Sequence, residues 1–106
     1  MIIICNDDDL LEAIEYANFI GKYKKLKSAS SFRLNLKKTI NLMRNSRDIN
    51  ELKLNGSLHY ERLKYELNGY SSVRIGYKTK YRLILKELES SIEIEAIEIS
   101  EHYGDK

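Results

Sequence analysis

The chain has 106 residues, of which 42% are hydrophobic and 32% charged; this composition is typical of one small globular domain and excludes a disordered segment. A single cysteine excludes an internal disulfide, and residues 2–5 form too short an apolar run for a signal peptide core. No apolar run approaches the length of a membrane helix, so we expect a cytoplasmic protein that has no membrane partner.

The formal net charge of +2 hides a very uneven distribution of charge along the chain. Residues 22–82 contain sixteen Lys or Arg and only four acids, a net charge of +12, whereas the segments before and after them each carry −5. A cationic surface attracts phosphate polymers and speeds their encounter. The central segment therefore favours a nucleic-acid ligand, with ordinary solvated lysines as the alternative.

The first half of the chain predicts a short strand and two helices. Residues 2–4 are β-branched, which is typical of a strand. Asp9 and Glu12 match a capping box, so we expect a helix from Leu10 to a stop at Gly21. After a basic connection over residues 22–31, a second helix is expected over 32–43, because apolar residues recur there at helical spacing: Phe32, Leu36, Ile40 and Met43.

The second half predicts antiparallel strands separated by turns. Asn55-Gly56 and Asn68-Gly69 are strong turn signals. Alternation of apolar residues predicts strands over 58–63, 70–75, 81–86 and 92–99. The apolar phase of the last strand shifts at Ile97, as a β-bulge would cause. The expected architecture is α+β: a single domain over 1–106 with a short N-terminal strand, a two-helix hairpin and a four-stranded antiparallel sheet.

The hairpin around Lys78 holds the pattern with the clearest chemical meaning. If it closes about Lys78, Val73 faces Leu83 toward the core and Arg74 faces Arg82 on the other side of the sheet. Like charges placed opposite one another are destabilising unless something offsets them. Two forked guanidinium groups suit a phosphate well, and pairing of each arginine with surface carboxylates is the alternative.

Two histidines are candidates for proton transfer. Continuing the last strand past its bulge brings His102 to the arginine side and gives Tyr103 the alternate phase, and His59 lies on the strand before the Asn68-Gly69 turn. Histidine exchanges a proton near neutral pH. Cys5, His59 and His102 do not have the spacing of metal ligands, so we expect no metal and no cofactor.

Aromatic and basic residues alternate along the same segment, which is the composition that unstacked RNA bases require. The alternative for the tyrosines is core or cross-strand packing, which we expect for Tyr81 at least. The candidate RNA-binding residues are Arg62, Lys64, Tyr70, Lys78 and Lys80.

The same segment contains a familiar ordered set of motifs: LHYERLK at 58–64, NGYSSVRI at 68–75, KYRLI at 80–84 and IEISEHY at 97–103. Taken together, these motifs resemble the RelE/ParE toxin superfamily, and within it the HigB-type, plasmid-killer branch. The resemblance covers about residues 55–104; the helical hairpin before them agrees only in layout. It implies a RelE-like microbial RNase fold and the toxin of a type II toxin–antitoxin system.

The resemblance also implies a reaction, namely metal-independent cleavage of mRNA on the ribosome by attack of the ribose 2′-hydroxyl. Arg82 would stabilise the charge on the phosphorane with the help of Arg74, and His59, His102 and Tyr103 would transfer protons or stack on bases. The implied partners are a cognate HigA-like helix-turn-helix antitoxin, the ribosome with its mRNA, and operator DNA bound through the antitoxin.

Two departures from the family pattern leave the acid and base roles open. The family often has Leu-Lys-Gly where this chain has Leu63-Lys64-Tyr65, and many HigB relatives end in aspartate-tyrosine-histidine, an order that His102-Tyr103 does not follow. Two other functions remain possible at this point: a ParE-like inhibitor of DNA gyrase, and a non-catalytic protein that binds its antitoxin and operator DNA.

Overall fold

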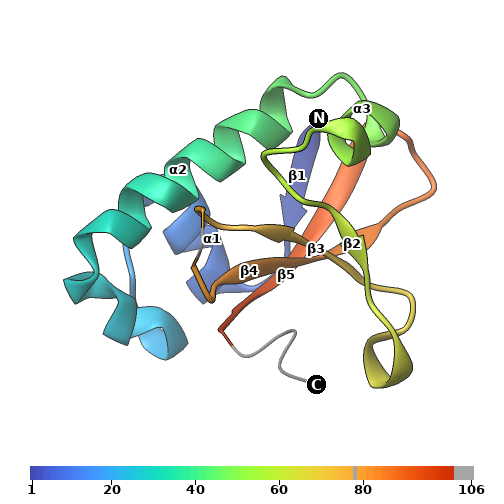
Figure 1. Cartoon of the computed structure of the whole chain (residues 1–106). Helices are drawn as coiled ribbons and strands as arrows, with labels where there is room; N and C mark the ends of the chain where they lie inside the picture. The colour runs from blue at the N-terminus through green and yellow to red at the C-terminus, as the bar shows by residue number, and fades with distance from the viewer. Residues whose placement is uncertain (78, 102–106) are drawn as a thin grey trace.

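One mixed β-sheet forms the framework of the chain, and the helices lie against one of its faces (Figure 1). The computed structural model describes residues 1–77 and 79–101. In chain order the elements are β1 (Ile2–Cys5), α1 (Asp8–Tyr16), η1 (Gly21–Ser28), α2 (Ser30–Asn45), α3 (Ile49–Leu54), β2 (Glu61–Arg62), η2 (Tyr65–Leu67), β3 (Ser71–Arg74), β4 (Arg82–Glu87) and β5 (Glu93–Ser100). None of the helices in the described part of the chain combines the length and apolarity that a membrane crossing requires.

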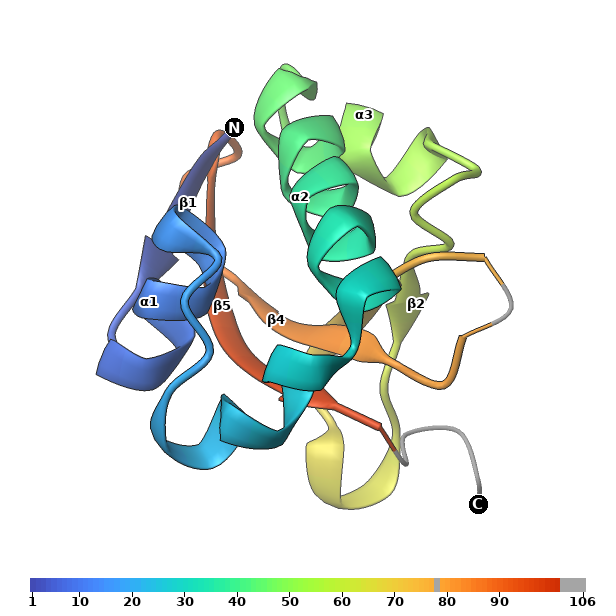
Figure 2. The same ribbon diagram turned by 90° about the vertical axis from the view of Figure 1, so that its left-hand side faces the viewer.

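The sheet confirms the predicted α+β architecture and adds one strand to it. Its order is β1-β5-β4-β3-β2, in which β2 to β5 are antiparallel neighbours. The N-terminal strand is not separate, because β1 pairs in parallel with β5 and places Ile3 beside Ile94. Figure 2 shows β1 and β5 side by side, with α1 in front of β1.

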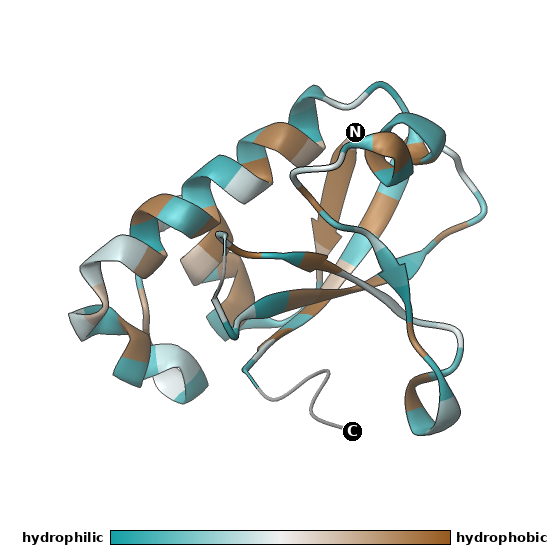
Figure 3. Ribbon diagram, viewed as in Figure 1, coloured by the Kyte–Doolittle hydropathy of each residue, from teal (hydrophilic) through white to brown (hydrophobic). Residues whose placement is uncertain are grey.

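The core lies between the helices and the inner face of the sheet. The predicted stripe of α2 is buried there, and in Figure 3 its apolar residues alternate with hydrophilic ones along the helix. The inner face of the sheet contributes Val73, Leu83, Leu85, Ile94 and Ala96 to the same cluster. Because alternate residues of a strand point to opposite sides, Arg74 and Arg82 belong to the outer face.

The first helix differs from its predicted bounds at both ends. It begins at Asp8 because Asp7, and not Asp9, is the N-cap: its Oδ1 accepts a hydrogen bond from the Leu10 N–H at 3.1 Å. It ends at Tyr16, where Ala17 adopts a left-handed backbone with φ 51°. The predicted stop at Gly21 is instead the first residue of η1, and the second helix extends two residues beyond its predicted bounds at each end.

Helix α3 was not expected from the sequence. Its N-cap is Asp48, whose Oδ1 accepts a hydrogen bond from the Glu51 N–H at 3.0 Å. The Asp-x-x-Glu spacing is the same capping signal that was applied to the first helix. The helix has only six residues, which is too short for apolar periodicity to reveal it.

Two strand predictions have opposite outcomes. The strand expected over 58–63 is wrong except at Glu61–Arg62, because His59 has φ 47° and so breaks the extended backbone. The bulge is confirmed: Leu85 pairs with Ala96 and Ile84 with Glu98, which leaves Ile97 as the extra residue of β5.

Candidate active site

Arg74 and Arg82 lie directly opposite one another on β3 and β4, in the predicted register. The same alternation shows which residues of the neighbouring strands lie on this side of the sheet, since Arg82 pairs with Ser100 of β5 and Glu61 of β2 pairs with Ser72. We call this side of the sheet the arginine face; it includes Glu61, Ser72, Arg74, Arg82, Ile84, Glu98 and Ser100, of which Ser72 and Ile84 are buried. The face thus concentrates two guanidinium groups on adjacent strands.

Two hydrogen bonds hold the Arg82 side chain in place. Its Nε donates to the hydroxyl of Ser72 at 2.8 Å, and its Nη2 donates to the backbone carbonyl of His59 at 2.7 Å. Ser72 is fully buried, so its hydroxyl is a fixed anchor. A guanidinium fixed along one edge is oriented before any ligand arrives, which is the condition for effective electrostatic stabilisation.

Arg74 is held by other means. Its guanidinium carbon lies 5.6 Å from the centroid of the Tyr77 ring. Its backbone N–H donates to Leu58 O at 2.7 Å, and its carbonyl accepts from the Thr39 hydroxyl at 3.3 Å. Within residues 1–77 and 79–101, no carboxylate forms an ion pair with Arg74, so the alternative of pairing with surface carboxylates does not hold for this residue.

The segment that carries His59 approaches both arginines. Leu58 bonds to the Arg74 backbone and His59 to the Arg82 side chain, which explains how the left-handed turn at His59 is maintained. The imidazole Nε2 of His59 lies 3.5 Å from Oε1 of Glu61, and both side chains are about half exposed. Sequence reasoning did not single out Glu61, although strand alternation from His59 was a signal that could have identified it.

The structure does not bring all the predicted RNA-binding residues together. Arg62 pairs with Ser71 and so belongs to the opposite phase from Arg74, and its guanidinium lies 3.8 Å from Glu87. Lys64 is exposed, and Tyr70 lines a cavity of ≈ 220 Å³ that Arg62 shares. Three candidates lie outside the described residues: Lys78, His102 and Tyr103.

A second charged cluster surrounds Glu87 at the end of β4. Its carboxylate accepts a hydrogen bond from the Tyr60 hydroxyl and lies 3.4 Å from Lys53 Nζ. Burial and the hydrogen bond to Glu87 raise the pKa of Tyr60 to about 12. Partial burial acts to raise the pKa of Glu87, but the Tyr60 hydroxyl and the cations of Lys53 and Arg62 outweigh it and hold that pKa below its ordinary value.

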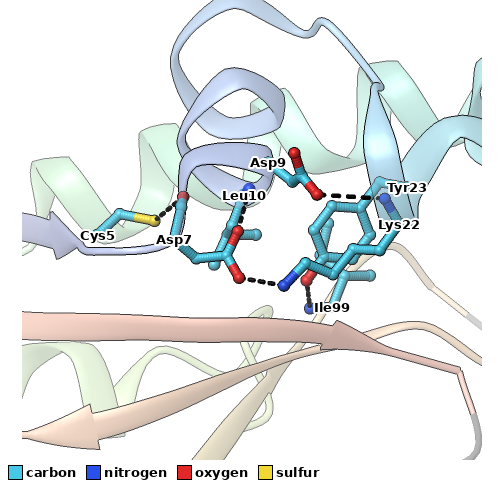
Figure 4. Close-up of polar contacts among 7 residues, drawn as sticks. All are labelled: Cys5, Asp7, Asp9, Leu10, Lys22, Tyr23 and Ile99. Carbon is cyan, nitrogen blue, oxygen red and sulfur yellow. Dashed lines mark hydrogen bonds and ion pairs between the residues drawn. The ribbon is translucent and has the colours of Figure 1, made fainter.

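The end of β5 beside Arg82 is held by η1, the segment that the sequence indicated only as a connection. Strand β1 pairs with β5 as far as Ala96, and beyond it the hydroxyl of Tyr23 accepts a hydrogen bond from the Ile99 N–H at 3.2 Å (Figure 4). Glu101 then lies 3.4 Å from Lys25 and 3.6 Å from Lys80. The predicted RNA-binding residue Lys80 is therefore tied to β5 in this structure.

A matched structure decides the fold. The chain superposes on the "YoeB/ParE toxin from Agrobacterium tumefaciens" with a TM-score of 0.58 and 20% sequence identity, over 97% of this chain and 100% of that one. This chain has the fold of a YoeB/ParE toxin. No family model matches the sequence, and no curated protein matches it either. The fold expected from the resemblance is thus confirmed, whereas the HigB-type branch stays a prediction.

On the YoeB/ParE framework, the arginine face is the outer surface of the sheet, opposite the helices. Among the described residues, no three His, Cys, Asp or Glu side chains gather closely enough to hold a metal ion. The groups on or beside the face that bear on chemistry include the two guanidiniums, the His59 imidazole and the carboxylates of Glu61 and Glu98. These groups can bind an anion and can accept or donate a proton.

Proposed function

We propose that this chain is the toxin of a type II toxin–antitoxin pair and that it cleaves mRNA on the ribosome without a metal. The observation that carries the proposal is the pairing of Arg74 with Arg82, in which Arg82 is fixed by Ser72 and by the His59 carbonyl. Two adjacent guanidiniums can donate forked hydrogen bonds to the oxygens of a phosphate diester and stabilise the added negative charge of its phosphorane. The YoeB/ParE toxin fold supports the same assignment.

The proposed reaction uses the RNA's own nucleophile. The 2′-oxygen attacks the adjacent phosphorus while the bond from phosphorus to the 5′-oxygen breaks, giving a cyclic phosphate and a free 5′-hydroxyl. Arg82 and Arg74 stabilise the negative charge of the phosphorane. The proton of the 2′-hydroxyl passes to a base, and an acid donates a proton to the leaving 5′-oxygen. The Glu61 carboxylate and the His59 imidazole, 3.5 Å apart, are described groups suited to these two transfers. His102 and Tyr103 remain proposed participants by resemblance.

The proposed protein partner is an antitoxin that silences the toxin, and a HigA-like helix-turn-helix protein that also carries the complex to operator DNA fits the proposal. A groove of ≈ 270 Å³ between α1 and α2 suits an acidic segment. The lining includes the cations Arg33, Lys37 and Arg44, of which Arg44 pairs with Glu15, and most of its apolar members are buried core residues. The cations of such a groove complement the charge of an acidic segment.

The deciding experiment maps mRNA ends after induction of the chain in bacteria and on purified translating ribosomes. Wild-type protein is expected to cut ribosome-bound mRNA, with or without added chelator, and Arg82→Ala is expected to cut at least a hundredfold more slowly. Arg47→Ala is the matched control, because Arg47 is exposed and pairs only with Glu51 in the described part of the chain. Growth arrest with intact mRNA and inhibited gyrase would instead support the ParE-like alternative.

A further inference from the structure

A second groove, on the other side of α2 from the α1 groove, lies between that helix and the β3–β4 hairpin. Its volume is ≈ 550 Å³, about twice that of the α1–α2 groove. The residues that carry the argument are Asn35, Lys38 and Thr39 of α2, Ser57 of the following loop, and Arg74 and Tyr77 of the hairpin. None of the residues that line it is acidic.

This groove begins at the candidate active site, because Arg74 belongs to both. Arg74 lies opposite Arg82 on the arginine face and also contributes to the wall of the groove. Tyr77, whose ring lies under the Arg74 guanidinium, is 76% exposed at the rim. A polymer bound at the arginine pair can therefore continue along the groove past an exposed aromatic ring.

The hairpin approaches α2 closely enough to close one end of the groove. Gly76 has φ +84°, and a Cβ atom at this position would lie 2.5 Å from Nδ2 of Asn35. Only glycine adopts this backbone readily and leaves room for the Asn35 amide. The lining is therefore built by a specific contact between two elements and is not a chance gap.

The chemistry of the lining favours RNA over a peptide. Lys38 and Arg74 supply positive charge, the polar groups of Asn35 and Ser57 can hydrogen-bond sugars and bases, and Leu42 is the sole aliphatic side chain larger than a methyl group in the lining. This groove is continuous with the arginine pair through Arg74, whereas the α1–α2 groove is not and also contains the carboxylate of Glu15. Cations combined with an exposed tyrosine are the usual means of holding single-stranded nucleic acid.

We propose that this groove holds the stretch of single-stranded RNA that adjoins the scissile phosphate, with Lys38 contacting the backbone and Tyr77 stacking on a base. The inference rests on the proposed function but concerns binding, so it can fail separately. The two grooves beside α2 then have different ligands: protein on the α1 side and RNA on the hairpin side.

The test compares two neighbouring lysines of α2 in a full-length protein that also carries Arg82→Ala and so does not cut the probe. Binding of a short fluorescent single-stranded RNA is measured by anisotropy over a range of salt concentrations. Lys38→Glu is expected to weaken binding about tenfold and to lower the slope of log affinity against log salt by about 0.7 or more. Lys37→Glu makes the same change of charge on the exposed residue that lines the α1 groove, and it should change affinity less than twofold.

Two further arms complete the test. Tyr77→Ala is expected to weaken RNA binding at least threefold with an unchanged salt slope, as the loss of stacking predicts. Equal effects of Lys38→Glu and Lys37→Glu, or no measurable RNA binding, would overturn the inference. A poly-glutamate of similar charge that binds as tightly and depends equally on Lys38 would assign the groove to an acidic peptide. In each of these cases, a loss of mRNA cleavage by the Arg82→Ala variant on ribosomes would still support the proposed function.

Discussion

The Arg82 guanidinium is bonded to the backbone carbonyl of His59 at 2.7 Å, so a residue of β4 holds in place the turn that precedes β2. The φ of 47° at His59 accompanies this contact. The residue whose cation is proposed to stabilise the phosphorane and the residue whose imidazole is proposed to transfer a proton are therefore joined by a direct hydrogen bond. Substitution of either residue should change the position of the other.

Arg82→Ala tests this hydrogen-bonded pair of residues most directly. Loss of a fixed charge at a developing phosphorane typically costs about 3–4 kcal/mol of barrier, so cleavage should fall by roughly a hundredfold or more. The substitution removes the bonds to Ser72 and His59 but also the repulsion with Arg74, so unfolding free energy should change by less than about 1 kcal/mol. Primer extension on ribosome-bound mRNA, with thermal melts, checks both. Arg82→Lys should rescue poorly, since an ammonium lacks the bidentate fork.

His59→Gly separates the imidazole from the backbone turn. Glycine adopts a positive φ freely, so this variant should be more stable than His59→Ala by about 1 kcal/mol. Cleavage should fall at least tenfold in both variants if the imidazole transfers a proton. Urea unfolding and single-turnover cleavage give the two readouts. Cleavage at the wild-type rate in both would remove the imidazole from the reaction.

The Tyr60–Glu87 pair predicts a dependence of stability on alkaline pH. The folded pKa of Tyr60, about 12, lies above its ordinary value of 10.0. The stabilising contribution is therefore complete below about pH 10 and is lost as the pH rises toward 12. Tyr60→Phe should cost about 1–2 kcal/mol at neutral pH and flatten the decline of stability between these values. Tyr65→Phe, at a side chain that is 86% exposed, is the control for the tyrosinate absorbance titration.

Gly21→Ala should destabilise the junction between α1 and η1. A Cβ atom there would lie 2.2 Å from Oδ2 of Asp9, the oxygen that accepts the Lys22 N–H at 3.2 Å, and φ is +55° (Figure 4). We expect a loss of more than about 1–2 kcal/mol in unfolding free energy, since backbone strain adds to the clash. Gly69→Ala is the matched control, because it has positive φ but nothing within 4 Å. An equal loss in both would show that the Asp9 contact contributes nothing.

Tyr23→Phe should loosen the end of β5. Tyr23 is 5% exposed, so removal of its hydroxyl leaves the Ile99 N–H without that acceptor, at a cost of about 1–3 kcal/mol. Hydrogen exchange at the Ile99 amide should accelerate more than exchange at Ile94, which lies within the β1 pairing. Tyr16→Phe, at a 72% exposed side chain, serves as the control. Uniform acceleration at both amides would indicate global destabilisation instead.

Strand alternation made the central register predictable from sequence. The pairs Val73–Leu83 and Arg74–Arg82 follow from a symmetric turn and a strict period of two, and the phase shift at Ile97 revealed the bulge. These features depend on residues close to one another in the chain. The fixed orientation of Arg82 was not predictable, because it depends on a left-handed residue, His59, whose conformation arises from long-range contacts.

Two of the features that sequence reasoning missed depend on distant contacts. The 3₁₀ segment η1 has weak periodicity, and its role follows from the Tyr23 contact with Ile99, 76 residues away. The sequence of residues 2–5 likewise does not indicate that β1 pairs in parallel with β5. For the candidate site, the arginine pair was predictable, whereas the position of Glu61 beside His59 depends on the left-handed turn at His59.

The pairing of β1 with residues 93–96 also has a consequence for synthesis. Residues 2–5 cannot pair with β5 until nearly the whole chain has been synthesised. Contacts of such large sequence separation are also slow to form. The arginine pair itself requires β3 and β4, and Arg82 meets Ser100 only when β5 is in place. A ribosome that makes this chain therefore carries it, through most of translation, in a form whose arginine face has not yet assembled.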